Sequence, residues 1–185
     1  MKKTIFTGAA VAIVTPMNDD FSVNYEKLGE LIDFQINNGT DAIVICGTTG
    51  ESATLTHEEH TKAIDYTVKK VAGRVPVIAG TGSNDTRYAV ELSLEAQKSG
   101  ADALLLVTPY YNKTTQAGLV RHLTYIADRV NLPMIVYNVP SRTGLDMKPA
   151  RYYELSKHPN IVAAKEANGN VTSVAKTAPP CGDNL

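Results

Sequence analysis

Three short apolar segments of the chain each lead into side chains that can react with, or hold, a carbonyl compound. Residues 161–165 end in the amine of Lys165, residues 133–137 end in the phenol of Tyr137, and residues 42–46 are followed by Thr48 and Thr49. Apolar surroundings lower the pKa of a lysine, and a neutral amine is a nucleophile. These residues therefore predict Schiff-base chemistry on a ketone or an aldehyde.

The neighbouring residues suit the other steps of such a reaction. Tyr137 can shuttle protons because a phenol both donates and accepts, and Thr48 can relay them. The hydroxyl and backbone N–H groups of Thr48 and Thr49 can hold a carboxylate. Arg142, in the predicted loop after residues 133–137, can bind a second carboxylate through two parallel hydrogen bonds. Each residue alone also fits a structural role, such as a lysine reaching into solvent, so the combination carries the prediction.

These groups must be positioned by a regular series of strands and helices. Short apolar runs recur about every 30 residues and end near Val14, Cys46, Ala79, Val107, Tyr137 and Lys165. That period predicts six βα units in one domain spanning residues 1–185. Residues 103–107 are apolar on both faces, as a parallel sheet requires.

Repeated βα units permit two architectures. An open doubly wound sheet needs only five or six strands, so the length of the chain favours it. An eight-stranded barrel brings the C-terminal ends of several strands to one site, so the chemistry favours the barrel.

Local signals mark some of the helix ends. Thr56 and Glu59 form a capping box for a helix that begins at His57. The last helix is expected to begin near Asn170 and to stop at Pro179–Pro180, because proline interrupts helical hydrogen bonding.

Composition excludes several classes of partner. The formal net charge is −1, which favours neither nucleic acid nor an anionic membrane. No segment approaches the ~18 apolar residues of a membrane span, and the apolar N-terminal stretch predicts a first strand rather than a signal peptide. Cys46 is expected to be a small buried residue rather than a nucleophile. These features predict a soluble cytoplasmic protein.

Four motifs carry a family resemblance, namely Gly47-Thr-Thr-Gly-Glu51, Val107-Thr-Pro-Tyr-Tyr111-Asn, Tyr137-Asn-Val-Pro-Ser-Arg-Thr-Gly144 and Lys165-Glu-Ala. From about Phe6 to about Leu185 the chain resembles the dihydrodipicolinate synthase (4-hydroxy-tetrahydrodipicolinate synthase) family. The resemblance implies a TIM-barrel lyase that condenses pyruvate with aspartate semialdehyde in lysine (diaminopimelate) biosynthesis. It implies no metal or organic cofactor, and a homotetramer built from two tight dimers.

The resemblance also assigns roles to individual residues. It makes Lys165 the amine that forms the pyruvate Schiff base, Tyr137 the proton shuttle and Thr48 its relay partner. It assigns Thr49 to binding the pyruvate carboxylate and Arg142 to binding the carboxylate of the aldehyde substrate.

Further roles implied by the resemblance lie between subunits. Tyr111 matches a tyrosine that completes the relay in the neighbouring subunit's site. An allosteric lysine site at the tight-dimer interface is matched by His57, His60, Asn84 and Tyr110, whereas Tyr88 replaces a glutamate that contacts the inhibitor's amine in sensitive relatives.

The chain departs from the family in length. Family members have eight strands and a C-terminal helical region, so six βα units predict a truncated barrel that lacks two strands. Three alternatives remain: a related aldolase such as N-acetylneuraminate lyase, an open-sheet binding module, or an inactive fragment that retains only dimer contacts. Thr49 and Arg142 favour the synthase over the related aldolases.

Overall fold

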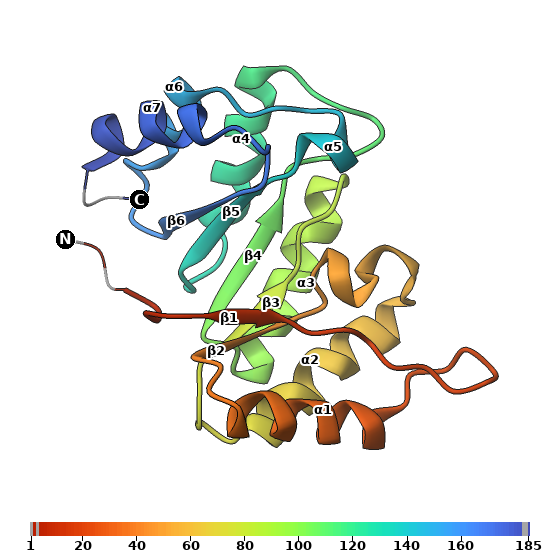
Figure 1. Ribbon diagram of the computed structural model, residues 1–185. Helices are drawn as coiled ribbons and strands as arrows, with labels where there is room; N and C mark the ends of the chain where they lie inside the picture. Colours follow the sequence, from red (N-terminus) through yellow and green to blue (C-terminus); the bar gives the residue numbers. More distant parts are fainter. Residues whose placement is uncertain (1, 3, 183–184) are drawn as a thin grey trace.

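A parallel sheet of six strands forms the centre of the computed structural model, which describes residues 2, 4–182 and 185 (Figure 1). The strands pair in the order of the sequence, and each neighbouring pair is parallel. They are β1 (Ala10–Ala12), β2 (Ala42–Ile45), β3 (Val77–Gly80), β4 (Ala103–Val107), β5 (Met134–Asn138) and β6 (Ile161–Glu166). The predicted series of six βα units is confirmed, with strand ends within two residues of the predicted positions.

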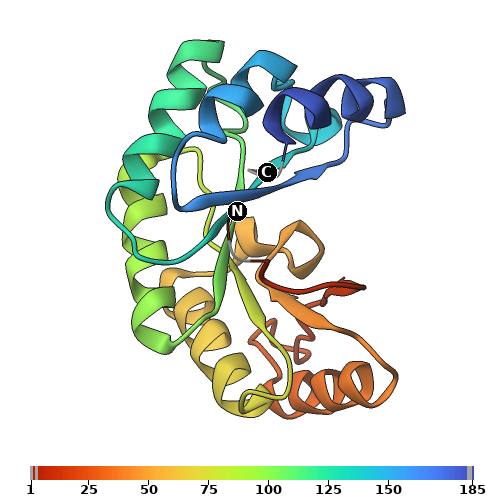
Figure 2. The ribbon, with the colours of Figure 1, turned by 90° about the vertical axis from the view of Figure 1, so that its left-hand side faces the viewer.

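Helices line the outside of the curled sheet (Figure 2). The long ones are α1 (Tyr25–Asn37), α2 (His57–Val71), α3 (Thr86–Ser99), α4 (Gln116–Ala127), α6 (Pro149–Leu155) and α7 (Val171–Cys181). Short helical turns follow two strands at their C-terminal ends, η1 (Thr48–Gly50) and η2 (Ser52–Thr54) after β2 and α5 (Pro140–Thr143) after β5. Within the described residues, none of the helices is both long and apolar enough to cross a membrane.

The two faces of the sheet bury different apolar clusters, because successive side chains of a strand point to opposite faces. Leu104 and Val136 belong to the large cluster that includes residues of the helices. Leu105 and Tyr137 belong to a smaller cluster on the concave inner face. A doubly wound sheet has helices on both faces, so this arrangement is that of a partial barrel and the open-sheet architecture is excluded.

A β-bulge sets the register of the last strand. Met134 of β5 pairs with Ile161, but the next residue, Ile135, pairs with Ala163, so β6 has one extra residue at this point. A bulge of this kind shifts every later side chain to the opposite face. Lys165 therefore faces the inner side of the sheet, although Ile161, four residues earlier, packs in the outer cluster.

The predicted capping box is present, whereas the predicted end of the last helix is wrong. The hydroxyl of Thr56 accepts from the Glu59 amide at 3.2 Å, and Glu59 Oε2 accepts from the Thr56 amide at 2.9 Å. Asn170 caps α7 as expected, but this helix continues through Pro179 and Pro180 to Cys181. Each proline removes one N–H from the helical hydrogen-bond ladder, and the buried Cys181 side chain nevertheless holds the last turn against the core.

The first described residue lies beside the last strand. Lys2 Nζ donates to the carbonyl oxygens of Ser156 at 2.6 Å and His158 at 2.7 Å, and also to that of Ile161. The side chain is partly buried, and this burial lowers its pKa. Lys2 thus links the beginning of the chain to the beginning of β6, at the end of the sheet opposite Lys165.

Candidate active site

The C-terminal ends of β5 and β6 bring Tyr137 and Lys165 together. The two residues are register partners, and Lys165 Nζ lies 4.2 Å from the centroid of the Tyr137 ring. Tyr137 is 6% exposed, whereas Lys165 is exposed on the last strand of the sheet. The electron-rich face of the ring attracts the ammonium, so the aromatic ring holds the amine at the position that the bulge in β6 selects.

Partial desolvation by the surrounding apolar residues lowers the pKa of Lys165. The side chain still reaches solvent, and water limits such a shift. The lowered pKa increases the fraction of neutral amine, which is the nucleophilic form.

Thr48 joins two adjoining cavities at this end of the sheet. With Tyr137 it lines a small cavity of about 20 Å³. With Arg142 and Tyr110 it lines a larger cavity of about 270 Å³. Because Ser52, Gly82 and Val107 also line both cavities, Thr48, Tyr137 and Arg142 surround one hollow.

Three of the predicted catalytic and substrate-binding residues line neither cavity, namely Lys165, Thr49 and Tyr111. Thr49 is exposed on η1 and belongs to the lining of neither cavity. Tyr111 is 92% exposed and has a left-handed backbone with φ of 66°. Within the described part of the chain, no hydrogen bond joins Thr48, Tyr137 and Tyr111. The prediction that Arg142 lies in a loop is wrong. Arg142 lies in the one-turn helix α5, which starts at Pro140.

The residues predicted for an allosteric site have separate environments. His60 is 3% exposed, and its Nε2 donates to the Gly80 carbonyl oxygen at 2.8 Å. Desolvation lowers the pKa of His60, so this imidazole connects α2 to β3. His57 is exposed, with its ring 5.8 Å from that of Tyr88. The Asn84 carbonyl accepts from the Asn112 side chain at 3.3 Å.

Cys46 is buried, as predicted. Burial raises the pKa of its thiol to about 12, which keeps it protonated and unreactive. In the described ranges, no three His, Cys, Asp or Glu side chains gather closely enough to hold a metal ion.

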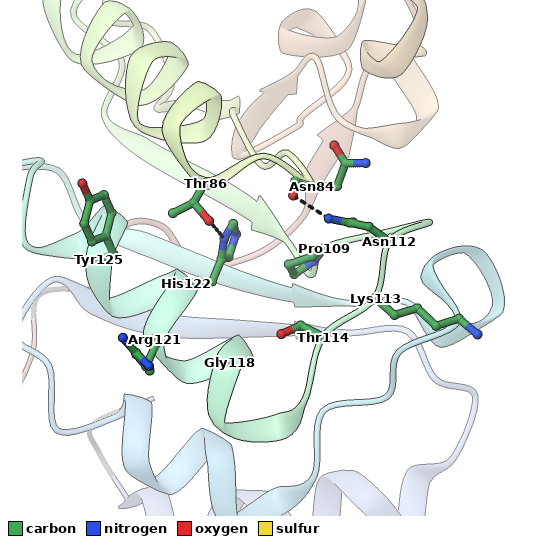
Figure 3. A pocket seen from close by; sticks show the side chains of 10 residues that line it. All are labelled: Asn84, Thr86, Pro109, Asn112, Lys113, Thr114, Gly118, Arg121, His122 and Tyr125. Atoms are coloured by element: carbon green, nitrogen blue, oxygen red, sulfur yellow. Dashed lines mark hydrogen bonds between the residues drawn. The ribbon is translucent and has the colours of Figure 1, made fainter.

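A larger cavity of about 380 Å³ lies away from Lys165, between the start of α3 and α4 (Figure 3). The Lys113 and Arg121 side chains on its rim point away from His122 in this view. His122 Nδ1 pairs with the Thr86 hydroxyl at 2.8 Å, and burial lowers the pKa of the imidazole to about 4. His122 is therefore neutral at pH 7.

Replacing His122 by glutamine is expected to reduce the decrease in folding stability at acidic pH. Between about pH 4 and pH 6.5 the unfolded chain binds a proton that the folded chain does not, so wild-type stability falls as the pH decreases through this window. The loss is at most on the order of 3 kcal/mol. Urea unfolding at neutral pH and near pH 4 measures it for wild type and His122→Gln, and His57→Gln serves as the surface control. Equal losses in wild type and His122→Gln would contradict the assignment.

One group of polar residues near Lys165, partly buried, was not predicted. Glu166 accepts from the side chain of Asn138 at 3.0 Å and from the hydroxyl of Tyr152 at 2.5 Å. The Asn138 amide also donates to Asp146 at 3.0 Å. The sequence contained one signal for this group. Asn138 and Glu166 directly follow Tyr137 and Lys165, and side chains alternate between the two faces of a strand, so in aligned strands Asn138 and Glu166 are neighbours on the other face.

Comparison with known sequences gives a consistent result. A family model described as "Dihydrodipicolinate synthetase family" matches residues 5–185. The 4-hydroxy-tetrahydrodipicolinate synthase of Thermoanaerobacter sp. (strain X514) is 63% identical over 175 residues, which cover 94% of this chain and 59% of that protein. The same enzyme of Lachnoclostridium phytofermentans is 61% identical over 182 residues, which cover 98% of this chain and 62% of that protein.

Solved structures agree with the sequences. A chloride-inhibited dihydrodipicolinate synthase from Acinetobacter baumannii, complexed with pyruvate, aligns with a TM-score of 0.96 at 47% identity and covers 98% of this chain and 62% of that one. The enzyme from Aquifex aeolicus aligns with a TM-score of 0.94 at 48% identity and covers 97% of this chain and 61% of that one.

The chain thus spans about three fifths of the length of the relatives that it matches. The family match, the sequence identity and the curled parallel sheet all support the same family, and the resemblance predicted from the four motifs is confirmed. The chain belongs to the dihydrodipicolinate synthetase family.

Proposed function

We propose that this chain carries the Schiff-base site of a cytoplasmic lyase that condenses pyruvate with aspartate semialdehyde in lysine biosynthesis. The observation that carries the proposal is the Lys165 amine, 4.2 Å from the Tyr137 ring at the ends of neighbouring strands. The solved relative from Acinetobacter baumannii, complexed with pyruvate, supports pyruvate as the first substrate.

The reaction begins when the neutral Lys165 amine attacks the keto carbon of pyruvate. The carbinolamine loses water to give an imine, and Tyr137 can donate and accept the protons of these steps. Loss of a proton from the methyl group of the bound pyruvate gives an enamine. The enamine carbon forms the new carbon–carbon bond with the aldehyde carbon of aspartate semialdehyde, whose oxygen takes up a proton.

The two substrate carboxylates have separate partners in this proposal. Thr48 and Thr49 are proposed to hold the pyruvate carboxylate; Thr48 lines the small cavity shared with Tyr137, and Thr49 follows it on η1. Arg142 lies on the larger cavity, which has room for the second substrate. A guanidinium binds a carboxylate with two parallel hydrogen bonds.

Borohydride trapping tests the proposal directly. The purified chain is incubated with pyruvate and sodium borohydride, digested, and mapped by mass spectrometry, with the fold checked by circular dichroism. One reduced pyruvyl group on Lys165 is the expected result. An adduct on another lysine, or a folded chain with no adduct, would contradict the proposed function.

Arg142→Ala is expected to affect the second substrate far more than the first. Losing a hydrogen bond to a charged group costs ~1.5–3 kcal/mol, which slows discharge of the pyruvate imine by aspartate semialdehyde roughly ten- to over a hundredfold. Formation of the imine should change little. Single-turnover measurements separate the two steps, and Arg142→Lys tests the two-pronged geometry because it keeps only the charge. Equal slowing of both steps would indicate a structural role.

Assembly and regulation follow from the same proposal. The exposed Tyr111 side chain is available to complete the relay in a neighbouring subunit of a tight dimer, two of which form the proposed tetramer. His57, His60, Asn84 and Tyr110 are proposed to belong to a lysine-binding site between these subunits. The internal hydrogen bond of His60 would have to persist or be exchanged on binding.

A further inference from the structure

We infer that Glu166, held by Asn138 and Tyr152, is a positioning residue that fixes the end of β6 so that the Lys165 amine stays above the Tyr137 ring. This inference rests on the proposed function, because it assigns Glu166 a task in the chemistry of Lys165.

Two successive register pairs at the ends of β5 and β6 have their side chains on opposite faces of the sheet. Tyr137 pairs with Lys165, and the next register pair is Asn138 with Glu166. Successive residues of a strand point to opposite faces, so the amine lies on the inner face and the carboxylate lies on the outer face. A displacement of Glu166 therefore moves Lys165, to which it is joined by one peptide bond.

The carboxylate of Glu166 has several partners from different segments. Asn138 Nδ2 donates to Oε1 at 3.0 Å and to Oε2 at 3.1 Å, the Tyr152 hydroxyl donates to Oε2 at 2.5 Å, and the Asn168 amide donates to Oε1 at 2.9 Å. Asn138 is fully buried, and its Oδ1 accepts from the Met147 amide at 3.1 Å. Burial, together with the adjacent Glu166, raises the pKa of Tyr152, so its hydroxyl remains a donor at neutral pH. These bonds join β5, β6 and α6.

The register shift near the start of β6 leaves the strand ladder irregular there. The network around Glu166 fixes the opposite end, where the reactive amine lies.

Tyr152→Phe is the sharpest test because it removes one hydroxyl and changes no charge. Tyr152 lies on α6 with its ring in the outer cluster, so it does not touch the proposed substrates. We expect the pyruvate adduct on Lys165 to form on the order of tenfold more slowly, because small displacements of a reacting group cost large factors in rate. Glu166→Gln, which replaces one acceptor oxygen by a donor, should slow it at least as much.

A second measurement follows the amine without pyruvate. Labelling with acetic anhydride across a range of pH, read by mass spectrometry with the exposed Lys98 as internal reference, reports the pKa of Lys165. In Tyr152→Phe the labelling midpoint of Lys165 should rise, because a looser strand end admits water and reduces the desolvation that lowers its pKa. Ile32→Val, buried on α1 far along the sheet, is the control for a loss of stability alone.

The outcomes separate the inference from the proposed function. If wild type forms the adduct and both Tyr152→Phe measurements match those of Ile32→Val, Glu166 has only a structural role and the inference is overturned. If wild type forms no adduct, the proposed function fails, while a shifted labelling midpoint in Tyr152→Phe still supports the positioning role. An unshifted midpoint in that case overturns both.

Discussion

Lys165→Arg is expected to abolish the reducible pyruvate adduct and leave the fold intact. A guanidinium remains protonated at all accessible pH values and cannot act as the nucleophile. It keeps a positive charge near the face of the Tyr137 ring, so the cation–π contact seen for Lys165 can persist. The lysine side chain is exposed on the edge strand, so the larger group meets little resistance. Borohydride trapping and thermal unfolding of wild type and variant measure the two effects.

Tyr137→Phe provides the matched comparison. It keeps the ring beneath the Lys165 amine and removes only the hydroxyl, so it separates packing from proton transfer. General acid–base catalysis contributes typically 10²–10⁴-fold, and adduct formation should slow by about that factor while still ending on Lys165. An adduct on another lysine in Lys165→Arg would refute the assignment of the nucleophile. An undiminished rate in Tyr137→Phe would assign the proton transfers to another group.

Much of this site could be predicted from residue spacing alone. The 30-residue period places the ends of β2, β5 and β6 at the same edge of a parallel sheet, which brings Thr48, Tyr137 and Lys165 together. The choice between a barrel and an open sheet could not be made from the period. It depends on which face of the sheet the helices cover, and the buried strands are apolar on both faces.

The face of the sheet on which Lys165 lies also could not be predicted from a single sequence. A strict alternation from the buried Ile161 puts Lys165 on the outer face, and only the register shift at Ala163 reverses this. No residue type in the segment 161–166 indicates a bulge, because a bulge depends on the pairing with the neighbouring strand. The role of Glu166 was hidden for the same reason, since its partners Asn138 and Tyr152 are identified only by register and by the packing of α6.

The second large effect is expected in the association state of the 185-residue polypeptide. The sheet has six strands, whereas a closed TIM barrel has eight. In the described residues, β1 and β6 each pair with one neighbour, so their outer edges offer free backbone N–H and C=O groups. The Lys2 hydrogen bonds join the two edges only at the start of β6. The exposed Val171, on the helix after β6, adds apolar surface.

We therefore expect the polypeptide to self-associate through β6 in a concentration-dependent way and to unfold at lower urea concentration than a relative with eight strands. Sedimentation velocity over a range of protein concentrations measures the association. Val162→Lys, which adds a charge to the β6 edge at the bulge, should reduce it, because charged side chains on edge strands oppose pairing with another chain. Val171→Lys adds the same charge on α7 and should reduce association less. A single monomeric species at every concentration in wild type would show that the edges are already protected. In that case the Lys2 bridge and the side chains of β6 suffice to close the sheet against other chains.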